Sequence, residues 1–297
     1  MAAHSTAFLS PHAIRVDRAL HARLDDCQSD ALADTLRTAA DLGPPEPAAV
    51  VLATAEHAAD RPSRSSQRDG PSGVGSDSGS GGDSEAGPLE PAVALGLIDL
   101  AARVHASTAE APGAPTVPNV ARTTDDSGFE GPTPQAILSS DVGFALGFGS
   151  IGTGEDPAVG VDRFGTLART MSDVTAGVWQ ATEWDGESVV DIEHALSRGA
   201  GSLYATALVV GLGNAADEEL RPAVRRVGTH LAVAVVLRRC EPLRELLDGA
   251  SLLAEADRRA DDRAVSARNA LAHVDAQLRD PLKTVLDGVL DGTCSGR

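Results

Sequence analysis

Clusters of acidic side chains are the most frequent candidates for a chemical function in this sequence. The stretch LDDCQSD, residues 24–30, holds an aspartate pair and a third aspartate, and carboxylates at this spacing can share a helix face and bind Mg²⁺. The pairs Asp125–Asp126 and Asp261–Asp262 offer the same ligands. In a chain rich in acids, such clusters also arise by chance on solvated helix faces. We therefore predict that all three groups are solvated surface features.

A glycine-rich motif is the next candidate. GFGSIG, residues 147–152, matches the GxGxxG pattern of dinucleotide-binding proteins. That site needs a strand before the glycines and a helix after them, whereas here a helical pattern precedes the motif. The pattern therefore favours a flexible connection between helices. A GxxxxGK[ST] phosphate-binding loop is excluded because the only lysine of the chain is Lys283.

An arginine pair ends the most apolar helical stretch, which runs from Leu231 to Leu237. Arg238 and Arg239 could interact with the carbonyl groups at a helix C-terminus, where cations are favourable. They could instead stand in a cavity, where they could pair with a carboxylate or bind an anion. The residues alone leave these three interpretations open.

Composition restricts the possible partners. The chain has 25 Lys and Arg against 43 Asp and Glu, a net charge of −18, and only 3% aromatic residues. This charge repels nucleic acids and anionic membranes, and the composition is typical of cytoplasmic proteins of extreme halophiles. The three cysteines form no CxxC pair and the histidines no HExxH, which argues against structural zinc and a disulfide framework. No secretory signal and no run of 18 apolar residues is found, so we expect a cytoplasmic protein without a membrane span.

The elements that must position these residues are predicted to be helices. Helical spacing of apolar residues extends over 12–40, 48–59, the stretch after Pro91, 135–148, 157–182, 188–213, 217–240 and 251–290. A Pro-, Gly- and Thr-rich connection covers 111–134, and residues 61–87 have too few hydrophobic side chains to fold, so we predict a disordered insertion there. The sequence therefore predicts an all-α fold, with one helical domain over 1–297.

The order of the segments resembles a known family. The chain carries, in this order, AVALGLIDLAARVHASTAE, GAPT, QAILSSDVGFALGF, GAGSLYATALVVGLG, VGTHLAVAVVLRRCEPL and ARNALAHVDAQLRDPLKTVLDGVL. This series resembles the trans-isoprenyl diphosphate synthase (polyprenyl synthetase) family over residues 12–290, apart from the insertion. The resemblance implies an isoprenoid-synthase-like helical bundle around a central cavity. In that family two Asp-rich motifs hold Mg²⁺, which binds an allylic diphosphate that reacts with isopentenyl diphosphate.

The chain departs from the family pattern at the metal-binding motifs. The first aspartate pair falls on Ala106 and Ser107, with Glu110 the remaining acid, and the second pair falls on Arg239 and Cys240. A cation in place of a carboxylate reverses the local charge, so the resemblance implies that the magnesium cluster cannot assemble.

The diphosphate-binding positions depart as well. The family's Lys-Thr pair falls on Gly199 and Ala200, and its GKxLRP stretch appears as GPPEP, residues 43–47. Asp141 matches the aspartate of the family's GD motif and Gln180 the glutamine of its GQ motif. The resemblance thus implies that this chain keeps the framework of the fold and lacks most of the family's reactive groups.

Three functions are compatible with this pattern. The first is a catalytically degenerate homologue that acts as a non-catalytic or regulatory partner of an active prenyl diphosphate synthase, or self-associates, since the family commonly dimerises through helices near its middle. In this hypothesis Arg238 and Arg239 lie at the cavity mouth and pair with Asp99 or Glu110. The second is an active prenyltransferase with the atypical ligands Asp99, Glu110, Asp141 and Glu183. The third is a prenyl-chain binder without turnover.

We expect no cofactor, apart from Mg²⁺ if the second hypothesis holds. We expect the partner to be a second copy of this chain or an active prenyl diphosphate synthase. The residues expected to line the cavity are Asp99, Ala106, Ser107, Glu110, Asp141, Gln180, Gly199, Ala200, Arg238, Arg239 and Cys240.

Overall fold

Helices make up nearly all of the described structure. The computed structural model describes residues 7–43, 45–59, 87–108, 123–124, 130–131, 134–151, 157–247 and 250–294. The helices are α1 Ser10–Asp25, α2 Asp30–Asp41, α3 Glu46–Ala59, α4 Leu89–Thr108, α5 Pro134–Gly149, α6 Pro157–Thr182, α7 Val189–Leu212, α8 Arg221–Arg239, α9 Glu241–Leu246, α10 Ala250–Ala270 and α11 Ala276–Cys294. Two short 3₁₀ helices, η2 Gly213–Ala215 and η3 Leu271–His273, complete them. The predicted all-α class is confirmed.

One small exception to the helical class lies in the segment expected to be a connection. The strands β1 Thr123–Thr124 and β2 Glu130–Gly131 pair antiparallel, with Thr123 opposite Gly131. Most of the insertion expected at 61–87 lies outside the described residues, which resume at Gly87.

Two helical stretches are each broken once where the sequence suggested continuity. The first is interrupted between Asp25 and Asp30, where the last buried residue of α1 is Leu24 and the first buried residue of α2 is Ala33. The second is interrupted by η3. Ile14 fits the helical spacing of apolar residues within 12–40 but is 61% exposed, so spacing alone does not identify the buried residues.

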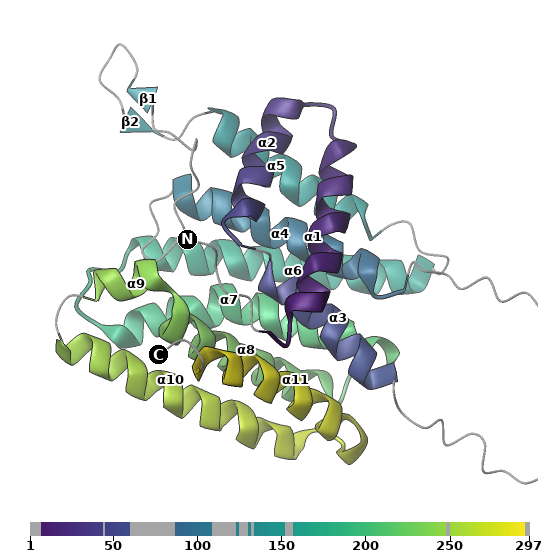
Figure 1. Ribbon diagram of the computed structural model, residues 1–297, viewed down its shortest axis with the longest axis vertical. Helices are drawn as coiled ribbons and strands as arrows, with labels where there is room; N and C mark the ends of the chain where they lie inside the picture. The colour runs from purple at the N-terminus through teal and green to yellow at the C-terminus, as the bar shows by residue number, and fades with distance from the viewer. Residues whose placement is uncertain are drawn as a thin grey trace, which may run out of the picture.

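The helices surround α7, which packs against α3, α6 and α8 (Figure 1). The helices α4 and α5 pack together, and α10 lies along α8. One hydrophobic cluster runs from Leu9 to Leu290 and joins the first and last helices of the chain. Among the described residues, no helix combines the length and the apolar character that crossing a membrane requires.

Glycines let the central helices approach one another closely. A Cβ atom on Gly228 of α8 would lie 2.5 Å from the Cα of Ala205 in α7. A Cβ atom on Gly177 of α6 would lie 2.4 Å from the backbone nitrogen of Gly199 in α7. Backbone therefore contacts backbone at both crossings, and the space between α6, α7 and α8 is small.

A buried carboxylate holds α10 against α7 and α8. Glu193 of α7, only 2% exposed, accepts a hydrogen bond from Arg259 Nη1 at 2.6 Å and pairs with Arg263. Arg263 Nη1 in turn donates to Nδ1 of His230 in α8 at 3.1 Å. Burial, and then the charge of Arg263, lower the pKa of His230.

We expect His230 to make the protein less stable in acid. Since its pKa is lower in the folded protein than in the unfolded chain, its contribution is complete above about pH 6.5 and is lost as the pH falls through the lowered folded pKa. Protonation would also remove the lone pair that accepts from Arg263. Thermal unfolding between pH 8 and pH 5 checks this. The melting temperature of His230→Gln should fall less between pH 8 and pH 5 than that of the wild type. The exposed control His273→Gln should show the same fall as the wild type. Equal losses in all three proteins would contradict the assignment.

Candidate functional site

The two positions that the family resemblance assigns to the facing metal motifs lie in one apolar cluster. Ala106, at the end of α4, is 7% exposed, and Cys240, which follows α8, packs against the same group of side chains. The buried members of this group, called the apolar cluster below, are Ala106, Ala181, Val189, Ile192, Ala195, Val233, Leu237, Leu243, Leu247, Ala256 and Ala260. The ends of α4 and α8 therefore both contribute to this apolar cluster.

Magnesium does not fit these residues. Mg²⁺ prefers carboxylate oxygens and water, and the apolar cluster offers methyl groups and one thiol. Burial raises the pKa of the Cys240 thiol, which keeps it protonated and a poor ligand. Across the described residues, no group of three or more His, Cys, Asp or Glu side chains is arranged to hold a metal ion.

Arg239 forms a second group, at the end of α8 next to the apolar cluster. Its Nη1 donates to Oε1 of Glu46 at 2.9 Å and its Nη2 donates to the carbonyl oxygen of Val289 in α11 at 2.7 Å. The hydroxyl of Tyr204 in α7 donates to Oε2 of Glu46 at 2.8 Å. Burial and the charge of Glu46 raise the pKa of Tyr204 well above its usual value, so the phenol stays a neutral donor. This Glu46–Tyr204–Arg239 cluster connects α3, α7, α8 and α11.

Asp99 lies near Tyr204 but binds a different arginine. Its carboxylate is 7% exposed and accepts a hydrogen bond from Arg103 Nη2 at 2.6 Å, one turn along α4. Arg103 Nη1 also donates to the carbonyl oxygen of Gly43 at 2.8 Å. The expected pairing of Arg239 with Asp99 is therefore wrong, because each group has a nearer partner, and Glu110 lies outside the described residues.

The neighbouring Arg238 faces away from Glu46. It pairs with Asp261 of α10, whose side chain is 71% exposed. At the C-terminus of α8, Arg244 Nη1 donates to the carbonyl oxygen of Leu237 at 3.0 Å. Of the three interpretations of the arginine pair, a structural salt bridge describes Arg239 best.

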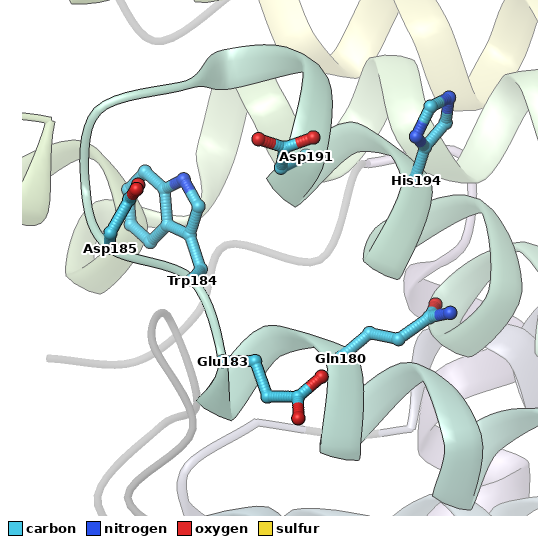
Figure 2. A pocket seen from close by; sticks show the side chains of 6 residues that line it. All are labelled: Gln180, Glu183, Trp184, Asp185, Asp191 and His194. Carbon is cyan, nitrogen blue, oxygen red and sulfur yellow. The ribbon is translucent and has the colours of Figure 1, made fainter.

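The remaining carboxylates of the enzyme hypothesis do not join Asp99. Asp141 is exposed on α5, and Glu183 is exposed near the end of α6. Gln180 and Glu183 line a surface pocket of about 270 Å³ between the end of α6 and the start of α7. Figure 2 shows the side chains spread around it rather than converging on one point; they are Gln180, Glu183, Trp184, Asp185, Asp191 and His194.

The other expected cavity positions carry no charge. Gly199 is buried where α7 touches α6, and Ala200 is partly buried and packs against the main hydrophobic core. Ser107 is partly buried beside Ala106. The structure thus uses the family's Lys-Thr position for helix packing.

The motif candidates on the surface are solvated, as expected. Asp25 has a 70% exposed side chain and binds Arg37 at 2.8 Å, and Asp262 binds Arg258 at 2.7 Å. Asp125 and Asp126 lie outside the described residues. The first glycines of GFGSIG belong to α5 rather than to the expected connection between helices. A Cβ on Gly147 would lie 3.0 Å from the Ala94 carbonyl oxygen, so this glycine serves packing.

Sequence reasoning missed Glu46 and Tyr204. The signal for Glu46 is present in GPPEP, where an acid occupies a stretch in which the family resemblance expects bases. Tyr204 is the only tyrosine of the chain and interrupts the apolar run of α7.

Comparisons with known proteins support the fold. No protein-family model matches the chain, and no curated protein matches its sequence. Solved structures do match. The chain is similar to geranylgeranyl pyrophosphate synthetase from the archaeon Geoglobus acetivorans, with a TM-score of 0.68 and 14% identity over 96% of this chain and 97% of that one. It is also similar to polyprenyl synthetase from Streptomyces coelicolor A3(2), with a TM-score of 0.64 and 16% identity over 96% and 99%.

A third similar structure is the geranyl diphosphate synthase small subunit from Antirrhinum majus, with a TM-score of 0.63 and 16% identity over 94% of this chain and 97% of that one. The sequence predicted a series of helices in the order of this family, and the solved structures match this chain over nearly its whole length. This chain has the all-α fold of the isoprenyl diphosphate synthases.

Proposed function

We propose that this chain is a non-catalytic member of the polyprenyl synthetase family that acts as a regulatory partner of an active prenyl diphosphate synthase. One observation carries the proposal: Ala106 and Cys240, at the positions of the two metal motifs, belong to one apolar cluster. Ionising an allylic diphosphate requires countercharge for a multiply charged leaving group. Methyl groups and a protonated thiol supply none.

The Glu46–Tyr204–Arg239 cluster supports the same proposal. In the family resemblance, bases stand in the stretch that contains Glu46 and acids stand at the end of α8. Here the signs are exchanged, and the two residues bind each other at 2.9 Å. Their side chains are only 22% and 21% exposed. The positions that would contact a diphosphate and its metal in an active enzyme carry side chains here that hold helices together.

A partner subunit gives such a chain a role. One similar solved structure is named as the small subunit of a geranyl diphosphate synthase. We infer a comparable assembly for this chain, with an active synthase as partner or with a second copy. The proposal needs no cofactor and, with the acidic composition, suggests a cytoplasmic location.

The outer faces of α5 and α6 are the surface that fits this partner. Ile137 and Leu138 of α5 and Val161, Phe164 and Trp179 of α6 are between 46% and 73% exposed. The rings of Phe148 of α5 and Phe164 of α6 lie 4.9 Å apart, so the two helices approach each other at this point. Exposed apolar patches of this kind mark association surfaces, and the family resemblance places a dimer contact on helices near the middle of the chain.

We expect the protein to form no prenyl diphosphate by itself. The measurement is a prenyl-transfer assay with allylic and isopentenyl diphosphates and Mg²⁺ in high salt, with the chain alone and mixed with an active polyprenyl diphosphate synthase. The chain alone should give no product above the protein-free control, and the mixture should change the product length or rate of the active enzyme. Product from the chain alone would contradict catalytic degeneracy.

Association is tested with a matched pair of variants. Phe164→Glu places a charge on the apolar face and should abolish both the effect on the active synthase and any oligomer seen by light scattering. Val265→Glu, at a 53% exposed position on α10, should change neither. If both variants behave like the wild type, the outer faces of α5 and α6 are not the association surface.

A further inference from the structure

Two arginines from different helices lie near each other beside the middle of α7. Thr170 of α6 and Thr206 of α7 share a hydrogen bond of 2.6 Å, which places the neighbouring Arg169 at this level of α7. From the other side, Gly228 of α8 abuts Ala205 of α7 so closely that a Cβ would approach to 2.5 Å. Arg225, just less than one turn before Gly228, is thereby brought close enough to Arg169 for their charges to repel.

A third guanidinium belongs to the same group. Arg221 precedes Arg225 by four residues, so both lie on one face of α8. Arg221 binds Asp162 of α6 at 2.9 Å and the carbonyl oxygen of Ala216 at 3.2 Å. The group of Arg169, Arg221 and Arg225 is called the arginine triad below.

Nearby carboxylates only partly compensate the arginine triad. Asp162 is already bound to Arg221. Asp173 of α6 accepts a hydrogen bond from Ser202 at 3.3 Å and lies 4.0 Å from Arg198. Both carboxylates therefore have partners, and neither is hydrogen-bonded to Arg225.

Arg225 is the group that lacks an acceptor. Its side chain is partly buried, yet it makes no hydrogen bond or ion pair with any described residue. Burial, followed by the charges of Arg169 and Arg221, lowers the pKa of Arg225. A guanidinium carries five N–H donors, and leaving them partly desolvated beside like charges is unfavourable unless an anion is present.

We propose that the arginine triad binds a phosphate-type oxyanion, either free phosphate or the phosphoryl group of a small molecule. Guanidinium groups match the geometry of phosphate oxygens and bind them through paired, charge-assisted hydrogen bonds. The site shares no residue with the apolar cluster or the Glu46–Tyr204–Arg239 cluster, so it does not depend on whether the chain is catalytic.

Thermal unfolding at constant ionic strength tests the site. Potassium phosphate replaces potassium chloride stepwise, in parallel with glycerol phosphate, so that free phosphate and an esterified phosphoryl group are compared. Phosphate should raise the melting temperature of the wild type with a saturable dependence. For Arg225→Gln the apparent Kd should be weaker by about tenfold or more. If glycerol phosphate stabilises equally, the site accepts a phosphoryl group; if it does not, the site takes the free anion.

Arg225→Gln has a second expected effect that a purely structural arginine would not show. Without phosphate, this variant should be as stable as the wild type or more stable, because an unpaired charge has been removed. Arg226→Gln, an exposed neighbour on α8, is the control and should respond to phosphate like the wild type. Arg169→Gln, at an exposed position, repeats the test without affecting the interior. Equal stabilisation of all four proteins by phosphate, or none of the wild type, overturns the proposal.

Discussion

Replacing Arg239 with glutamine will lower the free energy of unfolding by about 3 kcal/mol. The variant leaves the Glu46 carboxylate, which is only 22% exposed, with Tyr204 as its remaining donor, and leaves the Val289 carbonyl oxygen without Arg239. A largely buried carboxylate that loses its cation costs far more than the pair contributes by itself. Denaturant unfolding at constant salt concentration measures the change.

The adjacent arginine provides the control. Arg238 binds Asp261, whose side chain is 71% exposed, so Arg238→Gln leaves no buried carboxylate without its cation and should cost less than Arg239→Gln. The double variant Arg239→Gln/Glu46→Gln should lose clearly less than the sum of its single variants, since the second change removes the unpaired charge. Equal losses for Arg238→Gln and Arg239→Gln would mean that the cluster does not hold the helices together.

Replacing Gly177 with alanine will lower the free energy of unfolding by about 3 kcal/mol. The new Cβ would lie 2.4 Å from the backbone nitrogen and 2.7 Å from the Cα of Gly199, and 2.8 Å from the carbonyl oxygen of Ala195. Because backbone atoms cannot rotate away as a flexible side chain can, α6 and α7 must separate. Thermal and denaturant unfolding both report the loss.

A second glycine of the same helix gives the matched control for Gly177. A Cβ on Gly165 of α6 would meet no atom within 4 Å. Gly165→Ala should therefore stabilise the protein by about 0.5–1 kcal/mol, because alanine restricts the unfolded chain and favours the helix. The two variants make the same chemical change with opposite expected signs. A destabilised Gly165→Ala would show that helix α6 is sensitive along its whole length and would remove the argument from close approach.

Both predictions concern contacts made by positions at which an active synthase would carry charge according to the family resemblance. Gly199 stands at the family's lysine and touches Gly177, and Arg239 stands at a metal-binding aspartate and binds Glu46. If the variants behave as expected, these positions stabilise the fold itself, which agrees with the proposed loss of catalysis.

The helical pattern of the sequence predicted most element positions well. The stretches 157–182 and 188–213 appear as α6 and α7 with nearly these bounds. Errors occurred where a break depends on which face is buried: α1 ends before Cys27, and the stretch expected at 251–290 is divided by η3. Apolar spacing is similar on both sides of such a break, so it does not reveal a change in direction.

By itself, the sequence determined the all-α class and the order of segments, and through the family resemblance it led us to expect no acidic pairs at two motif positions. These properties depend on residue types and on spacing within one helix, which a linear sequence contains directly. Only the tertiary structure decided that Arg239 binds Glu46, which is 193 positions away, and that Ala106 and Cys240 share one apolar cluster. The partner of a charge is the group that packing brings within a few ångströms, and here packing is set by helices far apart in the chain.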